Sequence, residues 1–285
     1  MARTVAELPA GSRITDYISL GVIAKFFPIE AVRKALKETG RESIRERDLP
    51  AHVVIYYVIA LALYMRSSYR EVLRCLLEGV QWLLDPSLRV KVAGKSGISQ
   101  ARSRLGYEPV KALYEAIVKP IASKQTRGAW YRQWRLVSLD GSTLDVADTL
   151  ENEQAFSRPG AKRGTSAFPK IRFVALLENG THVLWGARMS AYTTDERTLA
   201  EQVAPALEKG MLCLADRLFP SYKLWNLAAK TGADLLWRNR ENAQLPVERE
   251  LPDGSYLSRI YASTSDRRKH RNGVMDASAP TAARP

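Results

Sequence analysis

Two short apolar segments that each end in an aspartate constrain the fold of this chain more than any other feature. Residues 135–140 read RLVSLD and residues 211–216 read MLCLAD. Runs of this kind, each followed by a turn or a polar break, are typical of buried strands. If the two strands are parallel neighbours, Asp140 and Asp216 lie roughly 5 Å apart at one edge of the sheet. Two carboxylates so close repel each other unless a cation neutralises them, which predicts a site for a hard divalent metal and for phosphodiester chemistry.

Each aspartate also has a simpler explanation. A carboxylate at the end of a strand often accepts hydrogen bonds from backbone amides, in a turn or at the start of the next helix. For either residue alone this explanation is favoured. Their occurrence as a pair, in a chain of strongly basic composition, favours the metal site.

The charge of the chain points to a polyanionic partner. It has 43 Lys and Arg against 30 Asp and Glu, for a net charge of +13, and nucleic acid is the first candidate. An evenly spread excess would indicate only a basic soluble protein, but here the charge is concentrated. Residues 157–172 contain no acidic residue, and their basic side chains are candidates for contacts with a phosphate backbone: Arg158, Lys162, Arg163, Lys170 and Arg172.

The first 125 residues have helical periodicity and no strand pattern. Helices are expected at residues 14–27, 29–39, 50–65, 69–84, 98–105 and 109–122. The longest apolar run, residues 53–65, is shorter than the roughly 20 residues of a membrane span and predicts a buried helix. No signal peptide is expected at the start. The only cysteines, Cys75 and Cys213, lack metal-ligand spacing and indicate free thiols in a reducing compartment.

One of these helices has a polar face suited to DNA. Residues 96–106 place Ile98, Ala101 and Leu105 on one face. The opposite surface could lie in a major groove as a recognition helix. The alternative is an ordinary solvated face, and the link to the preceding helix is longer than in a standard helix-turn-helix. The candidate DNA contacts are Gln100, Arg102 and Arg104.

From residue 130 the pattern becomes α/β. The strand at 135–140 is followed by a hairpin of residues 171–178 and 182–189 around the Asn179-Gly180-Thr181 turn. A helix is expected from Thr193, where a capping-box pattern with Glu196 begins, to Gly210, with a possible kink at Pro205. The strand at 211–216, a helix at 221–230 and a strand at 233–237 follow. This is the element order of a ribonuclease H-like sheet.

Several motifs, taken in order, resemble the DDE transposases of bacterial insertion sequences, in the insertion-sequence-four family. They are residues 139–144 (LDGSTL), 156–160 (FSRPG), 167–172 (AFPKIR), 178–182 (ENGTH) and 214–219 (LADRLF). The resemblance covers residues 10–272. It implies an α+β protein of two domains, an all-helical N-terminal DNA-binding domain (1–125) and an incomplete ribonuclease H-like α/β core (130–240), followed by part of a β-rich insertion (241–272) and a low-complexity tail (273–285).

The resemblance also implies a chemistry. Asp140 and Asp216 match the first two acidic residues of the catalytic triad, which hold Mg²⁺ or Mn²⁺ during cutting and joining of DNA. Arg217 and the basic run would hold the backbone. The implied partner is double-stranded DNA, both the terminal inverted repeats of an element and the target. A homo-oligomer on DNA, a cytoplasmic location at the bacterial nucleoid and no membrane association are expected.

The third acidic residue of the triad is not found. In the family it is a Glu within a Tyr, Arg, Glu, Lys pattern on a helix, and no such pattern follows residue 237. The loss of hydrophobic patterning after residue 275 suggests truncation by a frameshift, the alternative being a natural disordered terminus. In either case the triad is incomplete and impaired catalysis is expected. Two alternatives stay open. One is a DNA-binding protein without catalysis, and the other is a metal-dependent nuclease whose third ligand is Glu241 or Glu250.

Overall fold

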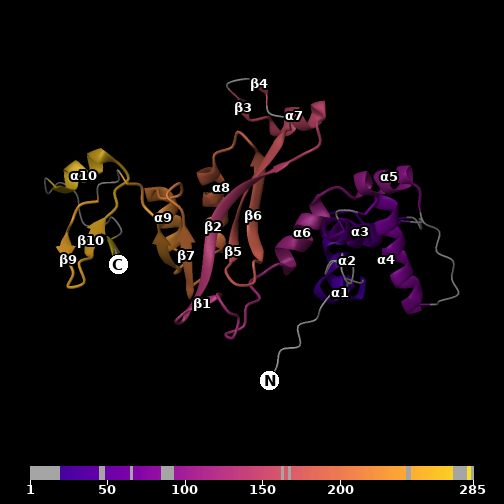
Figure 1. Ribbon diagram of the computed structural model, residues 1–285, viewed down its shortest axis with the longest axis horizontal. Helices are drawn as coiled ribbons and strands as arrows, with labels where there is room; N and C mark the ends of the chain where they lie inside the picture. Colours follow the sequence, from indigo (N-terminus) through magenta and orange to yellow (C-terminus); the bar gives the residue numbers. More distant parts are fainter. Residues whose placement is uncertain are drawn as a thin grey trace, which may run out of the picture. The chain divides into compact units, whose positions relative to one another are not determined.

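The chain divides into two compact units, Met1–Ile117 and Val118–Pro285. The computed structural model describes residues 20–44, 49–64, 67–84, 93–161, 164–165, 168–241, 245–271 and 281–283. The first unit is helical and the second contains a mixed sheet (Figure 1). The change from helical to alternating apolar periodicity near residue 130 marks this difference in the sequence.

The first unit packs around one apolar helix. Its helices are α1 (Leu20–Phe26), α2 (Ile29–Glu38), α3 (Ala51–Leu63), α4 (Tyr69–Leu84), α5 (Lys95–Leu105) and α6 (Glu108–Ile117). Helix α3 contacts α1, α2, α4 and α5, which explains why it is apolar on nearly every side. Its buried tyrosines satisfy their hydroxyl groups, because Tyr56 donates to the Phe27 carbonyl at 2.6 Å and Tyr57 to the Tyr69 carbonyl at 3.0 Å. The expected buried helix is therefore confirmed.

The sheet of the second unit has the order β6-β5-β2-β7-β8. Its strands are β2 (Trp134–Asp145), β5 (Lys170–Glu178), β6 (Leu184–Ala191), β7 (Met211–Ala215) and β8 (Asp234–Trp237), and the short β1 (Trp130–Tyr131) pairs with β2. Strands β2, β5 and β6 are antiparallel, whereas β2, β7 and β8 are parallel. The expected hairpin of β5 and β6 is confirmed, with Gly180 at a φ of +92° in its turn.

Helices α8 (Glu196–Val203) and α9 (Tyr222–Ala229) supply apolar side chains to a core shared with the sheet. Val137, Leu139 and Cys213 of the sheet are buried against Leu199 and Leu224 of the helices. Side chains alternate along a strand, so neighbours of these residues point to the other face. The remaining elements are α7 (Leu150–Phe156), β3 (Gly160–Ala161), β4 (Gly164–Thr165), β9 (Arg249–Glu250), β10 (Tyr256–Arg259), α10 (Thr264–Arg271) and β11 (Thr281–Ala283).

The structure corrects the expected boundaries of β2 and α8. Strand β2 does not end at Asp140, since it continues to Asp145 in antiparallel pairing with β5. Only its pairing with β7 stops, at Leu139 and Ala215. Helix α8 starts at Glu196, with Asp195 and not Thr193 at the N-cap, and the Asp195 side chain makes no capping bond. Its α-helical part ends before Pro205, which lies in a 3₁₀ turn.

Candidate metal and nucleic-acid site

Asp140 and Asp216 occupy neighbouring positions on adjacent parallel strands. The last paired residues of β2 and β7 are Leu139 and Ala215, and each aspartate comes one residue later. Leu139 is buried, and the alternation along the strand turns Asp140 to the opposite face, where it is exposed. The expected parallel pairing of the two strands is thus found. Both aspartates line one open hollow of about 610 Å³, together with Ser138, Leu139, Leu214, Ala215, Leu236, Trp237 and Arg238.

Turn and helix-capping roles explain little of how the two aspartates are arranged. Oδ1 of Asp140 accepts a hydrogen bond from the adjacent Gly141 amide at 2.8 Å, a local contact that leaves Oδ2 available. Helix α9, which follows Asp216, is capped by the Ser221 hydroxyl, which accepts from the Leu224 amide at 3.2 Å. Capping therefore does not explain the Asp216 carboxylate.

A glycine beside Asp140 allows helix α8 to approach the sheet. A Cβ atom on Gly141 would lie 3.2 Å from Cδ of Glu196 and 3.2 Å from Cγ2 of Val174. Gly141 and Asp140 face opposite sides of the strand, so Glu196 lies across the sheet from the aspartates. Within the residues that the structure describes, no cluster of three His, Cys, Asp or Glu side chains could hold a metal. Glu241 and Glu250, the alternative third ligands, form no such cluster with the two aspartates.

Arginines accompany the aspartates at this end of the sheet. Arg217 follows Asp216 and is exposed. Arg238 follows β8 and lines the same hollow, and its amide donates to the Ala215 carbonyl at 2.9 Å. Nε of Arg240 donates to the Arg217 carbonyl at 3.3 Å. Sequence reasoning missed Arg238 and Arg240, although the position of Arg238 directly after a parallel strand, like that of Asp216, was an available signal.

The basic run between the aspartates is largely neutralised. Arg158 forms ion pairs with Asp148 and Glu153, and its side chain is only 15% exposed. The other pairs in this region are Lys170 with Asp145 and Arg172 with Glu196. The acidic partners of Arg158, Lys170 and Arg172 come from segments outside residues 157–172, which is why the local sequence shows no compensating charge. Lys162 and Arg163 lie outside the described residues.

The polar face of α5 is exposed as expected. Ile98, Ala101 and Leu105 are buried in the helical core, whereas Gln100, Arg102 and Arg104 are exposed. The Arg102 guanidinium lies over the ring of Tyr69, 5.4 Å from its centroid.

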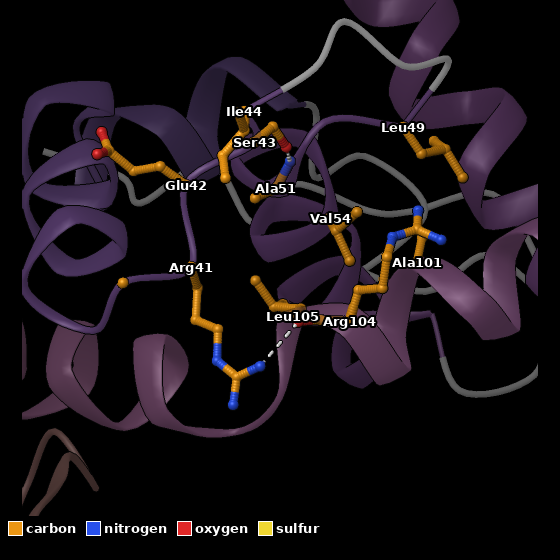
Figure 2. Close-up of a pocket in the computed structure, with 11 residues that line it drawn as sticks. Arg41, Glu42, Ser43, Ile44, Leu49, Ala51, Val54, Ala101, Arg104 and Leu105 are labelled. Carbon is orange, nitrogen blue, oxygen red and sulfur yellow. Dashed lines mark hydrogen bonds between the residues drawn. The ribbon is translucent and has the colours of Figure 1, made fainter.

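Figure 2 shows Arg41 and Arg104 at a second hollow, of about 480 Å³, beside α5. The Arg41 guanidinium donates to the Arg104 carbonyl at 3.3 Å. Arg41 is also paired with Glu108 at 3.4 Å, so Arg104, on the polar face of α5, is the arginine of the two that forms no ion pair among the described residues.

Comparison with known proteins agrees with this organisation. The family model described as "Insertion element 4 transposase N-terminal" matches residues 17–115, within the helical unit. The chain is 26% identical over 242 residues to "Transposase InsG for insertion sequence element IS4" of Escherichia coli (strain K12), a match that covers 84% of this chain and 53% of that protein. The chain is therefore similar to insertion element 4 transposases, most clearly in residues 17–115.

A second relative supports the same family. "Putative transposase InsZ" of Escherichia coli (strain K12) is 24% identical over 220 residues, which are 77% of this chain and 71% of that protein. The chain spans about half the length of InsG. The family resemblance inferred from the sequence motifs is confirmed. No helix among the described residues is long and apolar enough to cross a membrane.

Proposed function

We propose that this chain acts on DNA as part of a DDE-type transposase, with Asp140 and Asp216 as carboxylate ligands of a divalent ion. One observation supports this function above the others: two carboxylates stand side by side on adjacent parallel strands and line a single hollow. The sheet order, three antiparallel strands followed by two parallel ones, is the one expected of a ribonuclease H-like core. The relatives are named as transposases.

The donor set suits Mg²⁺ or Mn²⁺. These ions prefer oxygen ligands, and Mg²⁺ in particular is usually held by one or two carboxylates, with waters and substrate phosphates completing its shell. Asp140 and Asp216 supply two carboxylates in an open site, so the residues fit one such ion. When bound, the ion would make a phosphodiester more reactive toward water or a hydroxyl group by withdrawing charge from it.

The remaining residues of the site would bind and orient DNA. Arg238 lines the hollow, and the exposed Arg217 directly follows Asp216. Their guanidinium groups can each donate two hydrogen bonds to a phosphate. In the helical unit, Gln100 and Arg104 on α5 would contact double-stranded DNA at the ends of the element. Target DNA and a second copy of the chain on the same DNA complete the proposed partners, in the bacterial cytoplasm at the nucleoid.

A second candidate is a DNA-binding protein with little or no catalysis. The observation that favours it is the lack of a third carboxylate near Asp140 and Asp216 in the described part of the chain. A two-metal cut needs a further ligand to fix the second ion. We therefore expect the 285-residue chain to bind DNA and one divalent ion but to cut DNA slowly.

Calorimetric titration with Mn²⁺ tests the proposed site. The wild-type chain should bind Mn²⁺, and Asp140→Asn and Asp216→Asn should each weaken binding about 10-fold or more, because each removes a charged ligand. Asp195→Asn is the matched control, since Asp195 is an exposed residue that forms a surface ion pair with Arg197. Equal Mn²⁺ affinity in all four proteins would reject the site.

A further inference from the structure

The tip of the β1–β2 hairpin gathers aromatic and basic side chains at one end of β2. Residues 116–139 contain no acidic residue, and their basic residues are Lys119, Lys124, Arg127, Arg132 and Arg135. Trp134 lies six positions before Asp140 on β2, roughly 20 Å at the rise of a strand. In Figure 1, β1 lies at the opposite end of β2 from α7. This surface is therefore separate from the hollow of the two aspartates.

The aromatic rings of the hairpin are held in fixed orientations. Tyr131 and Trp134, paired across the turn, stack with centroids 6.4 Å apart and an angle of 12° between the rings. Nε1 of Trp134 donates to Asp234 at 2.6 Å, and Nε1 of Trp130 donates to the Ser123 carbonyl at 2.7 Å. Tyr131 nevertheless remains 50% exposed. An ordered, partly open ring of this kind can stack on another flat group without further loss of conformational freedom.

The cations around these rings differ in whether they are paired with a carboxylate. Arg135 is paired with the buried Glu178. By contrast, Lys124 and Arg132 form no ion pair with any carboxylate in the described part of the chain, and both are exposed. The Lys124 ammonium lies 3.5 Å from the ring centroid of Trp130, and the Arg132 guanidinium lies 5.4 Å from that of Tyr131. Their charges are available to a phosphate beside the rings.

The turn itself carries an unusual residue. Arg132 has a φ of +52°, at the first central position of a two-residue hairpin turn, where glycine is the usual residue. A non-glycine residue there costs stability. Among the described residues, the Arg132 side chain makes its contact with the ring of Tyr131. An arginine at this position places a positive charge at the tip of the hairpin.

We propose that this hairpin tip is a second nucleic-acid contact, in which Tyr131 stacks on an unpaired base while Arg132 and Lys124 hold the adjacent phosphates. Every base has a flat face, and an aromatic ring flanked by cations is the combination that binds single strands without regard to sequence. A base within a duplex has both faces covered, so the ligand is a single strand or a frayed end. This inference depends on the proposed function in one respect, that the chain acts on DNA, and does not depend on the metal site.

Fluorescence anisotropy with a labelled 20-nucleotide oligodeoxythymidine tests the proposal in the full chain. Tyr131→Ala should weaken binding about 5-fold to 150-fold, the usual range for one stacked base, whereas Tyr131→Phe should bind as the wild type does. Arg132→Gly should lower the slope of log affinity against log salt by about 0.7. Because glycine suits the turn, this variant should be at least as thermally stable as the wild type. Lys37→Ala, at an exposed position in α2, controls for loss of charge.

The outcomes separate this inference from the proposed metal site. If Tyr131→Ala and Arg132→Gly bind the oligonucleotide as tightly as the wild type does, the hairpin contact is rejected while the metal site stands. If Asp140→Asn leaves Mn²⁺ binding unchanged but the hairpin variants weaken DNA binding, the metal site fails and the hairpin contact is supported. A wild-type chain that binds no oligonucleotide would reject the hairpin contact, and the Mn²⁺ titration would still decide the metal site.

Discussion

Replacing the buried Glu178 with glutamine should strongly lower the free energy of unfolding of the sheet unit, although Glu178 lies next to the β5–β6 turn. The Glu178 side chain is fully buried. Its Oε2 accepts from the amides of Ile121 and Ala122, both at 2.9 Å, and from the Thr181 hydroxyl, while Oε1 pairs with Arg135. The carboxylate thus ties together the segment before β1, the start of β2 and the β5–β6 turn.

The size of the effect follows from these contacts. A glutamine side chain has one acceptor oxygen and one NH₂ group. If the NH₂ group takes the place of Oε2, it faces the two amides and the Thr181 hydroxyl; if it takes the place of Oε1, it faces the Arg135 guanidinium. Removing one partner of a buried ion pair costs about 3–5 kcal/mol, and the lower value applies here because the Arg135 side chain is 21% exposed. For a unit of this size, about 3 kcal/mol corresponds to a fall of about 6–12 °C in Tm.

Thermal unfolding followed by tryptophan fluorescence measures this effect. Trp130, Trp134, Trp185, Trp225 and Trp237 all lie in the sheet unit. The control is Glu201→Gln, because Glu201 pairs with the exposed Lys223 and such surface pairs contribute about 0–1 kcal/mol. If Glu178→Gln lowers Tm no more than Glu201→Gln does, the argument for a buried anchor is wrong.

Three further outcomes are expected. Burial raises the pKa of the Cys213 thiol to about 11, so this thiol should resist labelling at pH 8 in the folded protein, and rapid labelling of both thiols at pH 8 would contradict this. Between about pH 9 and 11 the thiol ionises in the unfolded state and stays protonated in the folded state, so the free energy of unfolding should fall across this range. Arg104→Ala should reduce the salt slope of duplex binding by about 0.9, and an unchanged slope would remove α5 from the DNA surface. Strand-cleavage assays with Mg²⁺ should show slow nicking at most, whereas efficient double-strand excision would reveal a third ligand.

The sequence predicted the elements that depend on local periodicity. The buried face of α5, the β5–β6 hairpin and the parallel pairing of β2 with β7 follow from the spacing of apolar residues and from turn residues such as Gly180. The position of Asp140 beside Asp216 could be anticipated for the same reason. Both aspartates directly follow apolar runs, and parallel strands bring such positions to one edge.

What the sequence did not predict depends on partners distant in the chain. Strand β2 continues past Asp140 because β5 pairs with its far half, and no local pattern at Gly141 indicates this. The basic run contains no acidic residue, but Asp145, Asp148, Glu153 and Glu196 approach it from other elements. A window of sequence shows the charges within it and not the charges that fold against it.

The most direct test of the metal site is an anomalous difference map from a crystal of the chain soaked in Mn²⁺. The account predicts a peak bound by a carboxylate oxygen of Asp140 and one of Asp216, at about 2.0–2.2 Å from each, as expected for a small hard cation. A peak on only one aspartate, or Mn²⁺ bound elsewhere with none between the two carboxylates, would contradict the central claim.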